Sequence, residues 1–271
     1  MTDHYRGNPP PTDALFVPGA ALERVLVHSW MRDEGMQSAW PGDDMPVPPD
    51  GTPIYVKIVN FPIGSMREVY LDAGARTHPH PSYEDVLFYQ IGGRRVQMCE
   101  DETGTLNPGD ASFEPHGVEH STYQLRPGLF VEFALPAPVR PNGRGMWLSA
   151  DEARVVPCAV WDEDGACRFA DGPDAFWAPA QAHRHDRRVF AFPGHDLIET
   201  VLPAGGRTGR RTEVHDTLFY VIAGTGAMTI GETMFAIVAG DTLRAPATMA
   251  YAMQSDSGMT VIQTAARALA G

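Results

Sequence analysis

The stretch THPHPSYED, Thr77 to Asp85, contains two histidines and a glutamate that could bind a metal ion. His78 and His80 are separated by one residue, so in an extended strand both side chains point to the same face. Glu84 follows His80 by four residues, which allows a tight turn before the next strand. An H-x-H pair in a Pro-rich loop is more often an ordinary polar segment, so the metal hypothesis depends on further donors elsewhere in the chain.

A second motif, GDASFEPHGVEH from Gly109, supplies a third imidazole at His120. Its Gly and Pro residues predict two turns, and His120 begins the strand that follows them. Three imidazoles and one carboxylate suit a borderline divalent metal such as Fe, Mn, Ni, Co, Cu or Zn. With only four protein ligands, an octahedral metal keeps two open positions for water, substrate or O₂. These residues therefore predict one divalent metal ion per chain.

Short β-type runs surround these motifs and must position them. In the first half of the chain they are IYVKIVN from Ile54, REVYLD from Arg67, VLFYQI from Val86, RVQMCE from Arg95, ASFE from Ala111 and FVEFAL from Phe130. Runs of this length, separated by turn residues, predict an all-β sandwich or barrel. A second β-rich region extends from Arg188 to Ala266, after a connector rich in Pro, Asp and Gly.

An internal repeat relates the two β-rich regions. At a constant offset of 131 residues three pairs of blocks align without a gap: GARTHPH from Gly74 with GGRTGRR from Gly205, EDVLFYQIGG from Glu84 with HDTLFYVIAG from His215, and GDASFEP from Gly109 with GDTLRAP from Gly240. Three matched blocks in one register indicate two copies of one β-domain.

Two segments of the first copy resemble a known family. From Gly74 to Gly92 the sequence reads G-x(3)-H-x-H-x(3)-E-x(7)-G, and from Gly109 to His120 it reads G-x(5)-P-x-G-x(2)-H. Together they closely resemble the two signature motifs of the cupin superfamily, which supply the metal ligands of a small β-barrel. The departures are small. The first glycine stands two residues closer than usual to the first histidine, the later glycine is one residue further away, and Gln124 replaces the usual Asn.

The resemblance implies an all-β fold with two jelly-roll-like cupin barrels in tandem, a bicupin of the three-His-one-Glu type. It also implies that the metal ligands are His78, His80, Glu84 and His120. The predicted organisation is an irregular Pro-rich N-terminal arm, a first barrel with the metal site, a connector, and a second, degenerate barrel without metal, at residues 1–50, 51–140, 141–185 and 186–271. Because cupin barrels leave sheet edges that arms and partner subunits cover, we expect a homodimer.

The second copy lacks the donor set of the first. The positions equivalent to the four ligands hold Gly209, Arg211, His215 and Tyr251. A guanidinium repels a metal ion, so we predict a structural barrel; the alternative is a small anion pocket in which Arg211 binds a carboxylate beside His215 and Tyr251. The other H-x-H, His183 and His185 in the connector, has no glutamate or partner motif at the right spacing and is interpreted as a surface or interdomain contact.

The predicted substrate pocket follows from alternation along the two strands that carry the ligands. Its lining residues are Val86, Phe88, Gln90, Thr122 and Gln124. Glu84 and Gln90 are the side chains predicted to take part in catalysis, although Phe88 and Gln90 also fit core packing and a satisfied core amide. Tyr55 or Lys57, and Arg67 or Tyr70, are further candidate lining residues, because the sequence leaves open which face of their strands points into the barrel. A mostly apolar pocket with a few polar groups and a metal is typical of a small-molecule site.

The two open metal positions decide the predicted chemistry. They could hold an enolate, catecholate or carboxylate-bearing substrate and polarise its carbonyl. If the metal is Fe(II), binding of both substrate and O₂ gives oxygenase chemistry, and the resemblance to three-His-one-Glu cupins favours a dioxygenase. The alternative is a redox-neutral isomerase, cyclase, lyase or decarboxylase that uses Mn, Ni or Zn, with Glu84 or a nearby Tyr as the base. A third class is a non-catalytic binding cupin, and fold alone does not decide among the three.

Composition excludes several other function classes. The chain has 271 residues, a formal net charge of −13 and no block of Lys and Arg, so a nucleic-acid-binding surface is not expected. Three widely spaced cysteines without a C-x-x-C motif fit a reducing cytoplasm rather than a disulfide framework. The N-terminus lacks the apolar core of a signal peptide, and no apolar run is long enough to span a membrane. We therefore expect a cytoplasmic enzyme with a small-molecule substrate.

Overall fold

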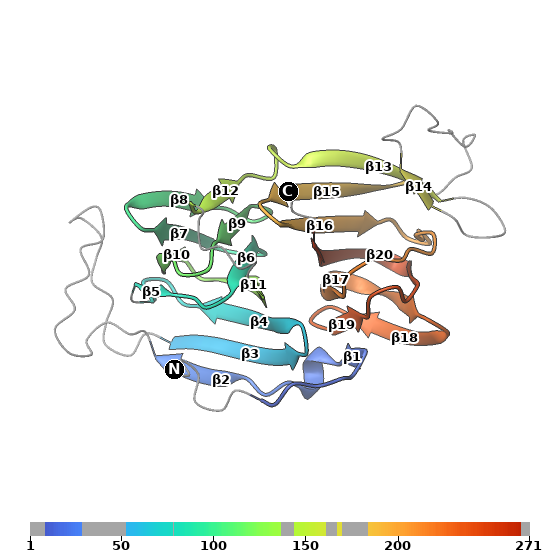
Figure 1. The fold of residues 1–271 in the computed structure, drawn as a ribbon, viewed down its shortest axis with the longest axis horizontal. Helices are drawn as coiled ribbons and strands as arrows, with labels where there is room; N and C mark the ends of the chain where they lie inside the picture. Colours follow the sequence, from blue (N-terminus) through green and yellow to red (C-terminus); the bar gives the residue numbers. More distant parts are fainter. Residues whose placement is uncertain are drawn as a thin grey trace. The chain divides into compact units, whose positions relative to one another are not determined.

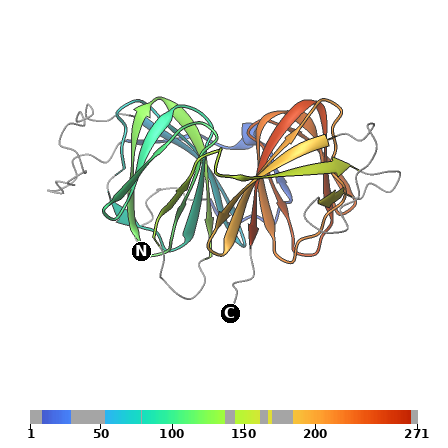
Figure 2. The same cartoon turned by 90° about the horizontal axis from the view of Figure 1, so that it is seen from above.

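Strands make up almost all of the described structure (Figure 1). The computed structural model describes residues 9–28, 53–77, 79–136, 144–160, 167–169 and 184–266, and none of these forms a helix long and apolar enough to cross a membrane. The chain divides into two compact units, one made of Met1–Thr12 and Leu22–Ala150, the other of Asp13–Ala21 and Asp151–Gly271. Figure 2 shows the strands of each unit arranged around its interior. The predicted all-β fold with two jelly-roll-like barrels is confirmed.

The first unit is built from two antiparallel sheets. The larger sheet has the order β12-β9-β6-β11-β4-β3-β2. Its strands are β2 (Val25–His28), β3 (Pro53–Phe61), β4 (Gly64–Leu71), β6 (Asp85–Gln90), β9 (Ala111–Glu114), β11 (Gly128–Leu135) and β12 (Met146–Leu148). The smaller sheet, in the order β5-β10-β7-β8, consists of β5 (His80–Pro81), β7 (Arg94–Cys99), β8 (Glu102–Leu106) and β10 (Glu119–Arg126). His80 and His120 thus lie on neighbouring strands of the smaller sheet, whereas Glu84 precedes the larger sheet's β6.

The second unit forms one continuous sheet path, β1-β19-β17-β20-β16-β15-β13-β14, with β18 paired to β17. Its strands are β1 (Phe16–Val17), β13 (Arg154–Val160), β14 (Cys167–Phe169), β15 (Arg184–Phe192), β16 (His195–Leu202), β17 (Thr217–Ile230), β18 (Thr233–Val238), β19 (Thr242–Ala245) and β20 (Tyr251–Ala266). The 3-10 helix η1 (Gly19–Ala21) follows β1. Part of the predicted irregular arm is therefore regular, because β1 pairs with β19 and β2 pairs with β3. Each added strand covers a sheet edge that would otherwise be unpaired.

The internal repeat predicted from the sequence recurs in the strands. β4 and β16 span equivalent residues at the offset of 131, and so do β9 and β19. Gly93 and Gly224, at equivalent positions, have positive φ angles of 76° and 85°. A Cβ on Gly224 would also lie 1.9 Å from the carbonyl oxygen of Gly258. Glycine is required at this turn because residues with a side chain rarely adopt that conformation and would collide with the neighbouring strand.

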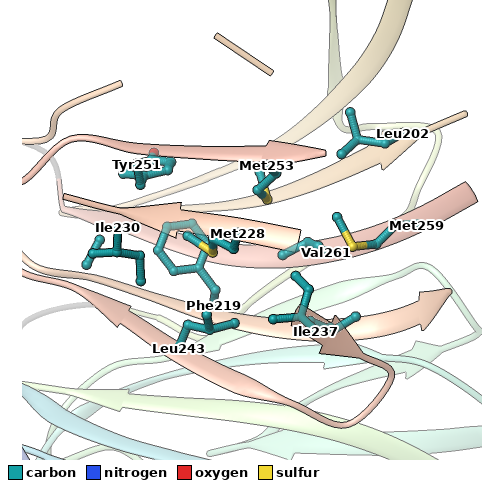
Figure 3. Close-up of a cluster of buried hydrophobic side chains, with 12 residues drawn as sticks. Leu202, Phe219, Met228, Ile230, Ile237, Leu243, Tyr251, Met253, Met259 and Val261 are labelled. Carbon is teal, nitrogen blue, oxygen red and sulfur yellow. The ribbon is translucent and has the colours of Figure 1, made fainter. Parts of the chain in front are cut away.

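Each unit buries an apolar cluster on the inner face of its strands. In the first unit the cluster consists of Ile54, Val56, Ile58, Val69, Leu71, Ala75, Val86, Phe88, Phe130 and Ala134. In the second unit (Figure 3) it consists of Leu202, Phe219, Val221, Met228, Ile230, Ile237, Leu243, Ala245, Tyr251, Met253, Met259 and Val261. Residues directly opposite each other on antiparallel strands share a face. The strand register therefore identifies which polar side chains share the interior with these clusters.

Candidate metal centre

The structure brings two of the predicted ligands into contact. His80 on β5 and His120 on β10 are directly opposite in the antiparallel register, and their ring centroids are 4.6 Å apart. His120 is buried, and its Nδ1 lies 3.2 Å from the carbonyl oxygen of Val118. When Nδ1 carries the proton and donates to that carbonyl, the neutral ring leaves the lone pair of Nε2 available to a metal ion.

The other two predicted ligands are not part of this pair. His78 lies outside the described residues. Glu84 lies in the bend before β6 and is half-buried. Within the part of the chain that the structure describes, no three His, Cys, Asp or Glu side chains are close enough together to hold a metal ion. The four-ligand set therefore stays a prediction.

A buried carboxyl group that the sequence analysis did not single out lies beside His120. Glu114, the last residue of β9, is 1% exposed, and its Oε2 lies 3.1 Å from His120 Nε2. Burial raises the pKa of the Glu114 carboxyl well above its usual range, and the positive charge of Arg95 opposes this shift only in part. Glu114 is therefore placed to hold a proton, or to bind a metal, beside the imidazole. Its signal in the sequence was its place in the GDASFEP block, where the second copy has Ala245.

Arg95 on β7 is a second buried charged group that the sequence analysis missed. Its side chain is 0% exposed, and its guanidinium carbon lies 4.7 Å and 4.2 Å from the ring centroids of Phe88 and Phe130. Its Nη1 donates to Gln97 Oε1 at 2.7 Å and to Thr122 Oγ1 at 3.1 Å. Burial lowers the pKa of Arg95 to about 10, so the guanidinium is still charged at neutral pH.

The predicted pocket residues are all buried on strands that face the first unit's interior. Phe88 packs on the guanidinium of Arg95, and Thr122 accepts a hydrogen bond from it. Gln90 and Gln124 instead donate through Nε2 to carbonyl oxygens two residues further along the chain. The Gln90 amide is only partly satisfied, because its Oε1 is buried without a hydrogen-bond partner among the described residues, and its part in catalysis stays a prediction.

The strand register also shows which face of the sheet is occupied by the four residues that the sequence left open. Arg67 lies on the inner face and forms an ion pair with Glu132, which is directly opposite on β11. Tyr55, Lys57 and Tyr70 share the other face. The charge of the Glu132 carboxylate is therefore neutralised by Arg67.

The equivalent interior of the second unit is largely apolar, although Gln263 is buried there and donates to the Tyr251 hydroxyl. At the offset of 131, Gln97, Thr122 and Glu114 correspond to Met228, Met253 and Ala245. All three of these second-copy residues belong to the buried cluster, and Met228 and Met253 are drawn in Figure 3. The scaffold that carries a polar interior in one copy is thus filled with apolar side chains in the other.

The second copy's remaining polar residues are arranged differently from the anion pocket considered above. Arg211 Nη2 lies 3.4 Å from Glu213 Oε1, and the Tyr251 hydroxyl donates to the same oxygen at 3.2 Å. His215 is exposed in the bend before β17. Because Glu213 already supplies a carboxylate to Arg211, a second anion there gains little. The geometry favours a structural second barrel.

The second H-x-H of the sequence is only partly described. His183 lies outside the described residues, and His185 lies on β15 opposite Cys158 on β13.

Comparisons with solved structures agree with this fold. Oxalate decarboxylase from Bacillus subtilis matches with a TM-score of 0.63 and 13% identity, over 96% of this chain and 78% of that one. AerE from Microcystis aeruginosa matches with a TM-score of 0.61 and 10% identity, over 79% and 93%. A cupin 2 conserved barrel domain protein from Leptotrichia buccalis matches with a TM-score of 0.50 and 12% identity, over 79% and 89%. No protein-family model and no curated protein sequence matches the chain.

Proposed function

We propose, from the premise that this chain folds as two cupin barrels, that its first barrel is a metal-dependent catalytic site for a small oxygenated organic molecule. The observation that carries the proposal is the contrast between the two copies. Burying charged and polar groups destabilises a protein unless they are fully paired, and the second barrel closes the same scaffold with apolar side chains. The scaffold therefore does not require the polar interior of the first barrel, and this contrast supports a functional role for it.

The residues that would hold the metal are His80 and His120, joined by His78 and by a carboxylate from Glu84 or Glu114. The donors present fit a divalent cation of borderline softness, because two imidazoles are in contact and a buried carboxyl lies 3.1 Å from one of them. A cation there would also compensate the burial of Glu114. When bound, the metal would act as a Lewis acid on a substrate oxygen.

The chain's own residues support redox-neutral acid–base chemistry best. Glu114 holds a buried carboxyl group whose Oε2 lies 3.1 Å from His120 Nε2. A carboxyl of this kind can give a proton to a substrate oxygen or carbon and take one back, as a general acid and base do. Val86 and Phe88 belong to the apolar cluster beside it, which excludes water from the same interior. We therefore place an isomerase, cyclase, lyase or decarboxylase first.

Dioxygenase chemistry with Fe(II) is the second candidate. What supports it is the predicted three-histidine, one-glutamate ligand set, which leaves two positions for substrate and O₂. In this candidate Glu114 is not needed as a general acid or base, because a dioxygenase does not require a carboxyl group that transfers a proton.

Two measurements test the proposal and separate the candidates. Elemental analysis of the chain, purified without added metal and without oxygen, is expected to give about one divalent metal ion per chain. Turnover of a panel of keto acids, hydroxy acids, diketones and catechols is then followed with and without O₂. Turnover without O₂ uptake supports the redox-neutral candidate, whereas iron together with O₂ uptake supports the dioxygenase. A chain without metal and without turnover would contradict both.

The variant Glu114→Gln sharpens that test. For redox-neutral chemistry we expect retained metal and a kcat reduced by about 10²- to 10⁴-fold, because the amide cannot carry the proton. Glu84→Gln is the matched control on the other candidate carboxylate. If Glu114→Gln loses the metal and Glu84→Gln keeps it, Glu114 is a ligand instead of the acid.

A further inference from the structure

Arg95 carries donors that its surroundings leave unused. Its Nη1 is bonded to Gln97 and Thr122, whereas its Nε and Nη2 have no hydrogen-bond partner among the described residues, although both are buried. A buried guanidinium with open donors destabilises the fold relative to an apolar side chain. The equivalent position in the second barrel is Gly226, so the scaffold itself does not need an arginine there.

No neighbouring carboxylate takes up these donors. Glu132 is paired with Arg67, and Glu114 faces His120. Across the described ranges neither carboxylate forms an ion pair with Arg95, although both act on it through space. The free edge of the guanidinium, Nε with Nη2, is the edge that binds a carboxylate through two parallel hydrogen bonds.

The strand register places the Arg95 guanidinium relative to the histidine pair. On β7 and β10 the opposite pairs are Arg95 with Gln124, Gln97 with Thr122, and Cys99 with His120. The bonds from Nη1 bring the guanidinium to the level of the Gln97–Thr122 pair. The His120 level is two residues further along the strand, which is about 7 Å at the usual rise per residue.

We infer that Arg95 binds a carboxylate group of the substrate, so that the first barrel takes small organic acids. This inference rests on the proposed function, since it names the substrate class of the same site. A carboxylate held by Arg95 would lie about 7 Å from the level of the histidine pair, a distance that a small organic acid can span. Gln97 and Thr122 fix one side of the guanidinium, and the rings of Phe88 and Phe130 hold its plane.

The test compares an acid with its neutral isostere. Binding of propionate and of propionamide is measured by calorimetry on the full chain with its metal, for the unchanged protein, for Arg95→Met and for Arg94→Met. Arg94 is the matched control because it is the preceding residue on β7 and is exposed. We expect the unchanged protein and Arg94→Met to bind propionate about 10- to 100-fold more tightly than propionamide, from the strength of charge-assisted hydrogen bonds.

Arg95→Met is expected to remove that preference while the chain keeps its metal and melts at the same or a higher temperature, because a buried charge is replaced by an apolar side chain. Arg95→Lys keeps the positive charge but loses the two parallel N–H donors of the guanidinium, so it is expected to keep part of the preference for propionate. It also serves as the second variant if Arg95→Met fails to fold.

Three outcomes separate this inference from the proposed function. A propionate preference that persists in Arg95→Met would overturn the inference, because another cation would then hold the carboxylate. A chain that contains metal but shows no preference in any variant would overturn it as well, and would leave the metal-dependent function standing. A preference that depends on Arg95 in a chain that holds no metal would support the inference and contradict the proposed function.

Discussion

Replacing Met228 with alanine tests whether the second barrel is a filled structural core. Met228 is 0% exposed and lies in the centre of the apolar cluster (Figure 3). It occupies the position that Gln97 holds in the first barrel. If the second barrel is structural, the change should reduce stability and leave the chemistry of the first barrel untouched.

The expected magnitude follows from the burial of the side chain. Alanine lacks three heavy atoms of methionine, and their transfer from water accounts for about 2 kcal/mol at about 0.8 kcal/mol per buried group. The cavity that they leave, about 75 Å³, lowers the stability by a further amount of at most about 1.8 kcal/mol, which applies if the barrel does not collapse around it. The free energy of unfolding should therefore fall by about 3–4 kcal/mol, within the range known for buried Met→Ala changes. The melting temperature should fall by about 10 °C.

Urea unfolding, followed by circular dichroism, measures this loss, with metal content and turnover determined on the same samples. Met234→Ala is the control, because Met234 lies on β18 of the same unit with 66% of its surface exposed, and it should change stability by less than about 0.5 kcal/mol. A loss below about 1 kcal/mol for Met228→Ala would refute the idea of a tightly filled barrel. A loss of metal from that variant would refute the assignment of the metal to the first barrel.

Three further predictions concern the first barrel. His120→Ala should abolish metal retention while the chain stays folded. Tyr251→Phe, at the equivalent position of the second barrel, should leave the metal content unchanged. Elemental analysis measures both, and equal losses of metal would contradict the one-site interpretation. Gly104→Ala should displace the indole of Trp147, because the new Cβ would lie 2.4 Å from the ring, so tryptophan fluorescence should shift and stability should fall by about 1–3 kcal/mol. Burial raises the pKa of the Cys99 thiol to about 12. In a variant whose other cysteines are serine, Cys99 should therefore react with thiol reagents at pH 8 about a thousandfold more slowly than free cysteine. Because its folded pKa exceeds the unfolded one, stability should fall as the pH rises above about 8.5; rapid labelling at pH 8 would contradict the burial.

The fold could be predicted from the sequence because its signals are local and occur twice. Gly93 and Gly224 each mark a turn that only glycine can form, and the blocks around them share one register across the two copies. The boundaries of the N-terminal arm were harder to predict. The β1 pairing of Phe16–Val17 depends on a sheet edge more than 200 residues away in the chain.

The candidate site was predicted only where a motif marks it. His80 and His120 stand in recognisable patterns, and the structure brings them together. Glu114 was missed because it ends a four-residue strand before a proline, where alternation is too short to establish which face it shares. Its place on the inner face follows from its pairing with Val86 on β6. Arg95 was missed for a related reason, because it is the first residue of the predicted run RVQMCE, where the sequence does not show which face a side chain shares.

The sequence by itself thus determined the kind of fold, the duplication and the histidine motif, because each is written in the spacing of nearby residues. Only the tertiary structure decided which charged side chains are inside the first barrel and that the second barrel is filled. Burial depends on which strands lie opposite one another, and that register joins residues far apart in the chain. The same register places Arg95 beside Phe88 and Phe130, and Glu114 beside His120.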